Sequence, residues 1–245
     1  MNDQDLLHYS RQIMLPEWGI EGQQKIANAK VLLMGVGGLG SASALYLAAA
    51  GVGYLRLVDF DKVDLSNLQR QVLHQFDGIG QSKVSSAKMR LSALNPDCNL
   101  SLINQELTEK ELLKQTDWAD IVVDGTDNFK SRFAINKACY QTQTPLVSGA
   151  AIRWEGQVSI FNLTTESPCY QCLYADNGAL DENCVNNGVI SPLVGIIGSI
   201  QALETLKILA QVGDCLENRL LIFDALYMQW RTLTLKRDPN CRICG

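Results

Sequence analysis

Four glycines in the segment GVGGLG form the first group of residues with a recognisable chemistry. Gly35, Gly37 and Gly40 have the spacing G-x-G-x-x-G, enclose Gly38, and follow the apolar run VLLM. Such glycines allow a tight strand-to-helix turn and a close approach of backbone to phosphate, and the helix N-terminus attracts anions. Asp59, in the next apolar run, can bond ribose hydroxyls. The segment predicts an adenosine-type nucleotide, although NAD, FAD and ATP share this motif and a ligand-free turn can have the same sequence.

Charged residues beyond Asp59 favour a triphosphate over a dinucleotide. Arg70 and Lys83 supply cations, which the β and γ groups of a triphosphate need. Asp124 and Asp127 follow a predicted buried strand, where a carboxylate can hold Mg²⁺ against phosphates. Each charge alone is typical of a solvated loop. Together they indicate a site, because all are predicted at strand ends near the glycine loop.

Four of the eight cysteines form two C-x-x-C pairs, Cys169 with Cys172 and Cys241 with Cys244. Two such pairs can close a tetrahedral Cys₄ site for Zn²⁺ with no open position, which is the form of a structural site. The metal would tie the C-terminal tail to the loop after residue 161. A redox C-x-x-C is the weaker alternative, because neither pair is predicted to begin a helix after a strand.

The elements that would position these residues alternate between strand and helix. We expect strands over 31–35, 54–60, 100–105, 121–124 and 146–150, and helices over 38–50, 82–94 and 128–141. This alternation is typical of a Rossmann-like, doubly wound α/β fold with a mostly parallel sheet. After residue 150, a strand over 155–163, a helix over 191–211 and two strands within 219–237 predict an antiparallel extension of that sheet.

One domain over residues 1–245 is expected, with a helical N-terminal arm (1–30), a nucleotide-binding half (31–150) and a second half (151–245). The formal net charge of -5 disfavours a nucleic-acid-binding face. Two apolar stretches, 44–58 and 191–210, contain glycines and charged residues, so we expect buried elements rather than membrane spans. The polar N-terminus lacks the apolar core of an export signal, which predicts a cytoplasmic protein.

Several motifs together resemble the MoeB/ThiF (HesA/MoeB/ThiF) adenylyltransferases, bacterial relatives of ubiquitin-activating enzymes. They are GVGGLG, VDFDKVDLSNLQRQ, GQSKV, DGTDN and the two C-x-x-C pairs, and the resemblance covers nearly the whole chain. It implies an enzyme that uses ATP and Mg²⁺ to adenylylate the C-terminal glycine carboxylate of a small ubiquitin-like sulfur carrier, releasing pyrophosphate. PLVSGAAIRWEGQVSIF and CYQCL favour a MoaD-like carrier of molybdenum cofactor biosynthesis, whereas YSRQIML and FDALYMQWR are shared with activators of a ThiS-like carrier of thiamine synthesis.

The resemblance also implies roles for individual residues. Arg11 matches an arginine that reaches into the ATP site of a partner subunit, which implies a homodimer with composite sites. Cys184 matches a cysteine assigned to a thioester or acyl-disulfide step, although a free cysteine is usually a small buried residue. The second half of the chain would bind the carrier. The nucleotide positions are Gly38, Asp59, Asp61, Ser66, Asn67, Leu68, Gln69, Arg70, Lys83, Asp127 and Asn128.

The proposed chemistry fits a chain that has only two histidines, His8 and His74. A carboxylate nucleophile is ionised at pH 7, so it needs no general base, and the barrier is electrostatic. An NAD- or FAD-dependent oxidoreductase, the distant alternative, would need a proton donor. A non-catalytic adaptor would be expected to lack the phosphate-binding charges. Since the chain ends just after its second C-x-x-C, sulfur is expected from a separate donor protein.

Overall fold

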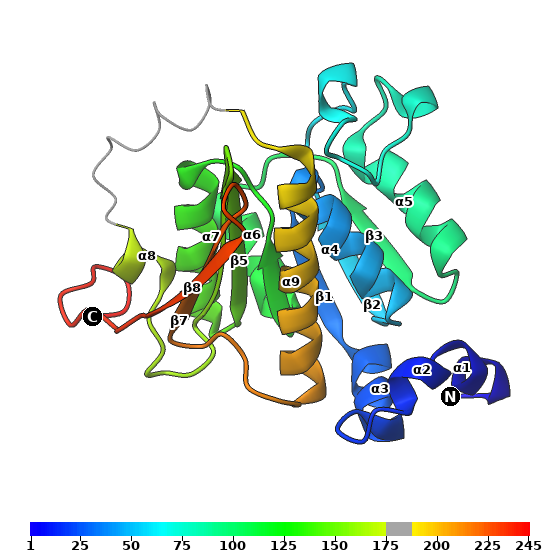
Figure 1. The fold of residues 1–245 in the computed structure, drawn as a ribbon, viewed down its shortest axis with the longest axis horizontal. Coiled ribbons are helices and arrows are strands. Elements are labelled where there is room, and N and C mark those ends of the chain that lie inside the picture. The colour runs from blue at the N-terminus through cyan, green and yellow to red at the C-terminus, as the bar shows by residue number, and fades with distance from the viewer. Residues whose placement is uncertain (175–187) are drawn as a thin grey trace.

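One eight-stranded sheet forms the centre of the computed structural model, which describes residues 1–174 and 188–245 (Figure 1). The strands lie in the order β3-β2-β1-β4-β5-β6-β7-β8. Strands β1 to β5 are parallel, and β6, β7 and β8 each run antiparallel to their neighbours. The predicted Rossmann-like sheet with an antiparallel extension is therefore confirmed. The strands are β1 (Lys30–Met34), β2 (Tyr54–Val58), β3 (Asn99–Ile103), β4 (Ile121–Asp124), β5 (Leu146–Ile152), β6 (Glu155–Phe161), β7 (Arg219–Asp224) and β8 (Gln229–Thr234).

The register of the parallel strands brings their carboxyl ends together. Met34, the last residue of β1, pairs with Val58 of β2 on one side and with Asp124 of β4 on the other. The chain order reverses between β1 and β4, and such a switch point is where ligands bind in open α/β sheets. The loops that follow β1, β2 and β4 therefore meet at one edge of the sheet.

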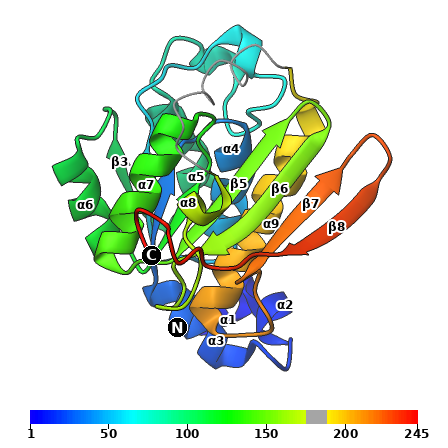
Figure 2. The ribbon, with the colours of Figure 1, turned by 90° about the vertical axis from the view of Figure 1, so that its left-hand side faces the viewer.

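Helices cover both faces of the sheet, as Figure 2 shows with α6 and α7 on one side of the strands and α9 on the other. Two apolar clusters, one on each face, bury these helices against the strands. One face carries α3 (Gly19–Asn28), α4 (Gly38–Ala49), α5 (Lys83–Leu94) and α9 (Ser191–Ala210), and the other carries α6 (Glu109–Trp118), α7 (Phe129–Thr142) and α8 (Tyr170–Leu173). Two 3₁₀ turns, η1 (Leu65–Asn67) and η2 (Phe76–Gly78), lie in the connection from β2 to α5.

Helix α9 packs against α4 along a row of small residues. A Cβ atom on Gly198 would lie 2.3 Å from the Leu39 carbonyl oxygen, and the Ser43 hydroxyl donates to the Gly198 carbonyl at 2.9 Å. By length and composition α9 is apolar enough to cross a membrane, and half of its apolar window is buried inside the protein. Its contacts with α4 and with the sheet make it a core helix of the fold.

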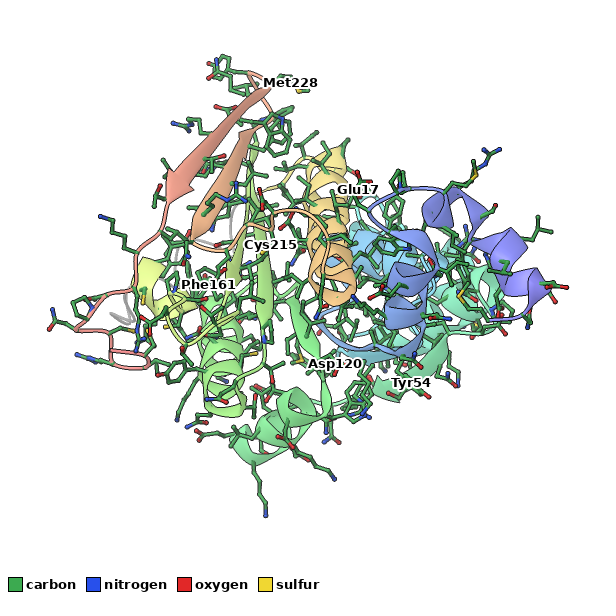
Figure 3. The ribbon with its side chains drawn as sticks, turned by 90° about the horizontal axis from the view of Figure 1, so that it is seen from below. Glu17, Tyr54, Asp120, Phe161, Cys215 and Met228 are labelled. Atoms are coloured by element: carbon green, nitrogen blue, oxygen red, sulfur yellow. The ribbon has the colours of Figure 1, made fainter. Side chains whose placement is uncertain are left out.

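The N-terminal arm consists of α1 (Asp3–His8), α2 (Ser10–Ile13) and α3, so the expected helical region is broken twice. Its anchor is the buried Gln23, whose Oε1 accepts from Gln12 Nε2 (2.9 Å) and Trp18 Nε1 (3.1 Å). Gln23 Nε2 donates to the Ala50 carbonyl at the C-terminal end of α4. The arm therefore lies below the amino ends of the strands, the side that Figure 3 shows with Tyr54 and Asp120 labelled.

The antiparallel extension ends in a hairpin of β7 and β8 with Met228 at its tip (Figure 3). Phe223 and Trp230 stack across the two strands with ring centroids 4.1 Å apart. Every residue of β8 is exposed, whereas β6, deeper in the sheet, is mostly buried. The extension thus widens the sheet without adding a second core.

Helix α6, between β3 and β4, was not predicted from the sequence. Its apolar positions are separated by charged residues, so a helical pattern is weak. A local signal did exist, because Thr108 and Glu111 form a capping box in which each side chain bonds the other's backbone N–H.

Candidate functional site

The glycine loop joins β1 to α4 at the carboxyl edge of the sheet. Gly35 has a φ of +83°, a conformation that side chains other than glycine rarely adopt. A Cβ atom on Gly40 would lie 1.9 Å from the Gly35 carbonyl oxygen, so only glycine allows this closure. Gly38 lies against Val194 of α9, whereas a Cβ on Gly37 would meet only the side chain of Gln71, at 3.5 Å. The glycine loop is therefore closely packed at Gly35, Gly38 and Gly40, whereas at Gly37 there is space for a ligand to approach the backbone.

Asp59 holds the glycine loop through backbone hydrogen bonds. One carboxylate oxygen accepts the Val36 N–H and the other accepts the Asp61 N–H, both at 2.9 Å. Burial raises the pKa of Asp59, and the nearby Lys83 ammonium and these N–H donors work against that rise. The side chain thus has a structural role as well as the expected nucleotide-binding role.

His74 fixes the other side of the same loop, a role that the sequence did not reveal. It is buried, with Nε2 at 2.9 Å from the Val36 carbonyl oxygen and Nδ1 at 3.1 Å from the Ser86 hydroxyl. Burial lowers the pKa of His74, which favours the neutral ring. A neutral ring that donates from Nε2 and accepts at Nδ1 satisfies both contacts.

Lys83, the first residue of α5, is buried to 5 % exposure and forms an ion pair with Asp61 at 2.7 Å. Its own N–H donates to the Asp61 carbonyl at 2.9 Å. Two bonds to the same residue fix the start of α5 next to the loop that follows β2. The ammonium group is also close enough to Asp59 to influence that carboxylate.

Arg70 is half-buried and held by residues of its own loop. Its guanidinium donates to Asn67 Oδ1 at 2.9 Å and to the Ser66 carbonyl at 3.2 Å. The adjoining residues Leu68 and Gln69 continue this turn, and the Ser191 hydroxyl at the start of α9 donates to the Gln69 carbonyl. The loop that carries the predicted cation is therefore anchored to α9.

The two aspartates after β4 have different environments. Asp127 is exposed, and the next residue, Asn128, caps α7 by accepting the Ser131 N–H at 2.8 Å. Asp124 is fully buried and accepts from the Thr126 N–H (3.0 Å) and hydroxyl (2.7 Å). Asp127 thus remains a candidate for a cation, whereas the carboxylate of Asp124 is enclosed by protein donors.

One of the predicted catalytic residues, Arg11, is not brought to this edge. Arg11 is exposed on α2, in the arm that is anchored to the far end of α4. The 12 residues of α4 span roughly 18 Å, so Arg11 cannot belong to the same cluster as the glycine loop. Cys184 lies outside the described residues.

The four cysteines of the C-x-x-C pairs meet at the start of α8. All four sulfurs lie within 4.8 Å of one another, with Cys169 to Cys241 at 3.5 Å and Cys172 to Cys244 at 3.3 Å. A tetrahedron of metal–sulfur bonds of about 2.3 Å needs sulfurs roughly 3.8 Å apart, so the group fits one metal ion. Burial raises the pKa of the Cys169 thiol, which a cation would reverse by stabilising the thiolate.

The prediction that neither C-x-x-C pair begins a helix is wrong for the first pair. Cys169 is the N-terminal cap of the one-turn helix α8, so the first pair does begin a helix in the loop after β6. The close approach of the second pair, rather than the absence of a helix, is what favours a metal over a redox disulfide. The Arg237 guanidinium also joins the C-terminal tail to the loop after β6, because it donates to the Cys244 and Thr165 carbonyls.

Comparisons with known proteins agree with this geometry. The chain is 44 % identical over 245 residues to the molybdopterin-synthase adenylyltransferase of Salmonella typhimurium, covering 100 % of this chain and 98 % of that one. It is also 44 % identical to the ThiS adenylyltransferase of Escherichia coli, covering 100 % and 97 %. The crystal structure of E. coli MccB with SeMet MccA matches with a TM-score of 0.85 and 24 % identity, over 100 % of this chain and 75 % of that one. The ThiF family model matches residues 9–243, and the chain therefore belongs to the ThiF family.

Proposed function

We propose that this protein uses ATP to adenylylate the C-terminal glycine carboxylate of a small ubiquitin-like sulfur-carrier protein. Full-length relatives at 44 % identity are adenylyltransferases, two of them named for molybdopterin synthase and one for ThiS. The observation that carries the proposal is the meeting of the glycine loop with Asp59, Lys83 and Asp127 at one sheet edge. Because these relatives are adenylyltransferases, they favour this activity over that of an NAD- or FAD-dependent oxidoreductase.

Each part of the edge has a role in this reaction. The open backbone at Gly37 would lie next to the phosphates, and Asp59 would bind the ribose. Arg70 and Lys83 would stabilise the negative charge that builds up as an anion attacks the α-phosphate. Asp127 would hold Mg²⁺, which offsets phosphate charge when bound. Residues of the same edge, Gly35, Gly38, Gly40, Asp61, Ser66, Asn67, Leu68, Gln69 and Asn128, would complete the nucleotide site.

The carrier supplies its own nucleophile, because its terminal carboxylate is ionised at pH 7. A general base is therefore unnecessary, which agrees with the structural role of His74. The protein's task is to position two anions and to stabilise the transition state with fixed cations. Cys184 is proposed as a candidate for a later covalent step with the carrier.

The larger organisation follows from the same proposal. Residues 31–150 would hold the nucleotide and residues 151–245 would receive the carrier, with Zn²⁺ as the structural ion of the Cys169, Cys172, Cys241 and Cys244 cluster. Arg11 would complete the ATP site of a second copy in a homodimer, because it lies far from the site of its own chain. A separate protein would donate the sulfur, in the cytoplasm, where thiols stay reduced.

The test is ATP–pyrophosphate exchange with purified carriers that end in Gly-Gly, one MoaD-like and one ThiS-like. We expect exchange that depends on a carrier and on Mg²⁺, with a MoaD-like carrier preferred. Stimulation by the ThiS-like carrier alone would assign the enzyme to the alternative pathway. Exchange with neither carrier would contradict the proposed activity. A carrier that lacks its last glycine is the matched control.

A further inference from the structure

Gln71, in the connection from β2 to α5, is a buried polar residue beside the glycine loop. It is 5 % exposed, and its Oε1 has no hydrogen-bond partner among the residues that the structure describes. A buried polar atom without a partner destabilises a folded protein, so native structures contain few of them. The stability of the fold therefore does not account for a glutamine at this position.

The backbone of Gln71 is fixed on both sides. Its N–H donates to the Asn67 carbonyl and its carbonyl accepts the His74 N–H, both at 3.0 Å. The His74 ring in turn contacts the carbonyl of Val36, the residue directly before Gly37. Gln71 is therefore held in a defined place relative to the glycine loop.

The Gln71 amide lies at the one open position of that loop. A Cβ atom on Gly37 would lie 3.5 Å from Gln71 Nε2, whereas Cβ atoms on Gly35, Gly38 and Gly40 would meet other atoms at 3.0 Å or less. The amide nitrogen thus borders the space in which a ligand can reach the backbone of the loop.

The same space adjoins the N-terminal end of α4. Gly37 is the N-cap of this 12-residue helix and makes no side-chain cap hydrogen bond. The first N–H groups of a helix lack partners within the helix, and the helix dipole favours an anion near them. An anion bound there would accept from the backbone of α4 and from Gln71 Nε2.

We propose that Gln71 is a nucleotide-binding residue whose Nε2 donates to a phosphate oxygen of ATP next to Gly37. The inference rests on the proposed function, because it adds a contact to the ATP site. Arg70 and Lys83 would supply charge to that site, whereas Gln71 supplies a neutral donor of fixed direction. The buried amide then gains an acceptor only when nucleotide binds.

The first test is Gln71→Met, which removes the amide and keeps a side chain of similar length. The free protein should melt at or above the wild-type temperature, because an unpartnered buried polar atom is lost. Calorimetry with Mg²⁺ and without a carrier should show ATP binding weakened roughly ten- to a hundredfold, since the lost hydrogen bond is to a charged group. Adenosine, which has no phosphate, should bind both proteins equally.

Two results of this test would overturn the proposal. ATP binding that stays at the wild-type level would assign Gln71 to the structure alone. Adenosine binding that weakens as much as ATP binding would exclude a contact with phosphate.

Gln71→Glu is the second variant, and it decides the question if Gln71→Met does not fold. It keeps the shape of the side chain but replaces the amide donor with an acceptor, which is ionised at about pH 8. We expect it to bind ATP more weakly than Gln71→Met, because a carboxylate repels phosphate. Binding as tight as that of the wild-type protein would overturn the proposal.

Two other glutamines provide matched controls. Gln75→Met changes an exposed glutamine of the same connection and should alter neither melting nor ATP binding. Gln23→Met changes a buried glutamine whose amide is hydrogen-bonded at both ends, so its melting temperature should fall. The opposite effects of the two buried substitutions on melting would separate a ligand-binding amide from a structural one.

Salt distinguishes a direct contact from the displacement of a neighbouring cation. Because Gln71 is neutral, ATP affinity should fall with ionic strength as steeply in Gln71→Met as in the wild-type protein, whereas Lys83→Met should reduce that dependence. A reduced dependence in Gln71→Met would overturn the direct contact.

The proposed function can fail separately. A wild-type protein that binds ATP but shows no exchange with either carrier would overturn the proposed function and not this inference. Wild-type ATP affinity in both Gln71 variants would overturn only this inference, and a wild-type protein that binds no ATP would overturn both.

Discussion

Arg70 and Asp127 are expected to matter for the reaction and not for the fold. Among the residues that the structure describes, Arg70 bonds only its own loop, and Asp127 is exposed. Loss of one charge that stabilises the transition state costs about 2–4 kcal/mol, roughly 30- to 1,000-fold in rate. We therefore predict that Arg70→Ala and Asp127→Ala lose most ATP–pyrophosphate exchange while their thermal unfolding stays unchanged.

The control is Arg90→Ala, which removes an exposed arginine from α5. This variant should keep wild-type exchange. Wild-type exchange in either Arg70→Ala or Asp127→Ala would remove that residue from the site.

His74 should make the stability of the protein depend on pH. Burial lowers its pKa in the folded state, so the unfolded chain binds a proton more readily. The stabilising effect of the neutral ring is present above the usual pKa of about 6.5 and is lost as pH falls through the lower folded-state value. Thermal unfolding from pH 7 to pH 5 should show a steeper loss of stability in the wild-type protein than in His74→Gln.

The only other histidine, His8, provides the control because it is exposed on α1. His8→Gln should reproduce the wild-type pH dependence. An identical pH dependence in His74→Gln would mean that His74 does not contribute to it.

The sequence predicted the polar residues of the site but not their supports. Glycine spacing and charges after strands predicted which sheet edge would hold a nucleotide, because local geometry requires those residue types at those positions. His74 gave no signal, since its role depends on a contact with Val36 that only the folded chain brings close. Asp124 and Asp127 looked equivalent in sequence, but in the structure Asp124 is buried and Asp127 is exposed.

At the scale of elements, two glycines in the turn from β1 to α4 should have different roles, Gly40 in packing and Gly37 in ligand approach. Gly40→Ala would place a methyl group 1.9 Å from the Gly35 carbonyl oxygen, so the strand and helix must separate. We expect a loss of about 3 kcal/mol in the free energy of unfolding. Gly37→Ala meets only a side-chain nitrogen at 3.5 Å, so it should keep its stability and weaken ATP binding.

Denaturant unfolding and ATP titration of both variants check this prediction. Equal destabilisation by the two changes would mean that Gly37 serves packing and not ligand approach.

The C-terminal segment should depend on the cysteine cluster. Cys241→Ser removes one of the four clustered sulfurs and should release the metal. A cation present at a hundredfold its dissociation constant contributes about 2.7 kcal/mol, so the melting temperature should fall by roughly 5–10 °C. Metal analysis, melting and limited proteolysis near the C-terminus are the measurements. Cys215→Ser, outside the cluster, is the control and should change none of them.

Strands with continuous apolar runs were predictable, whereas α6 and the breaks in the arm were not. β1 and β4 are buried on both faces, so their sequences consist almost entirely of large apolar residues. Helix α6 has only one buried large apolar residue, Leu112, so its pattern is weak. The break at Tyr9 accompanies a tertiary contact with Asn95, which no local pattern contains.

At the scale of the whole molecule, the proposed dimer makes a prediction about mixtures. In a heterodimer of Arg11→Ala with Arg70→Ala, one site receives Arg11 from the partner and keeps its own Arg70. Random pairing gives half heterodimers with one intact site each, or about a quarter of wild-type activity. We expect two variants that are each nearly inactive to regain this fraction of ATP–pyrophosphate exchange when they are refolded together.

A mixture of Arg70→Ala with Lys83→Ala is the control, because both changes affect the same side of a composite site. No heterodimer in that mixture has an intact site, so activity should stay low. Equal activity in the two mixtures would contradict a site shared between subunits.

The cysteine cluster also has a topological consequence. Cys169 and Cys241 are 72 positions apart, and α9, β7 and β8 lie between them. A metal that joins them closes the chain into a ring, which lowers the conformational entropy of the unfolded chain. Because the ring includes the helix that supports the glycine loop, unfolding of that helix would have to occur within a closed loop. The lifetime of the folded protein in the cell would then depend on metal supply.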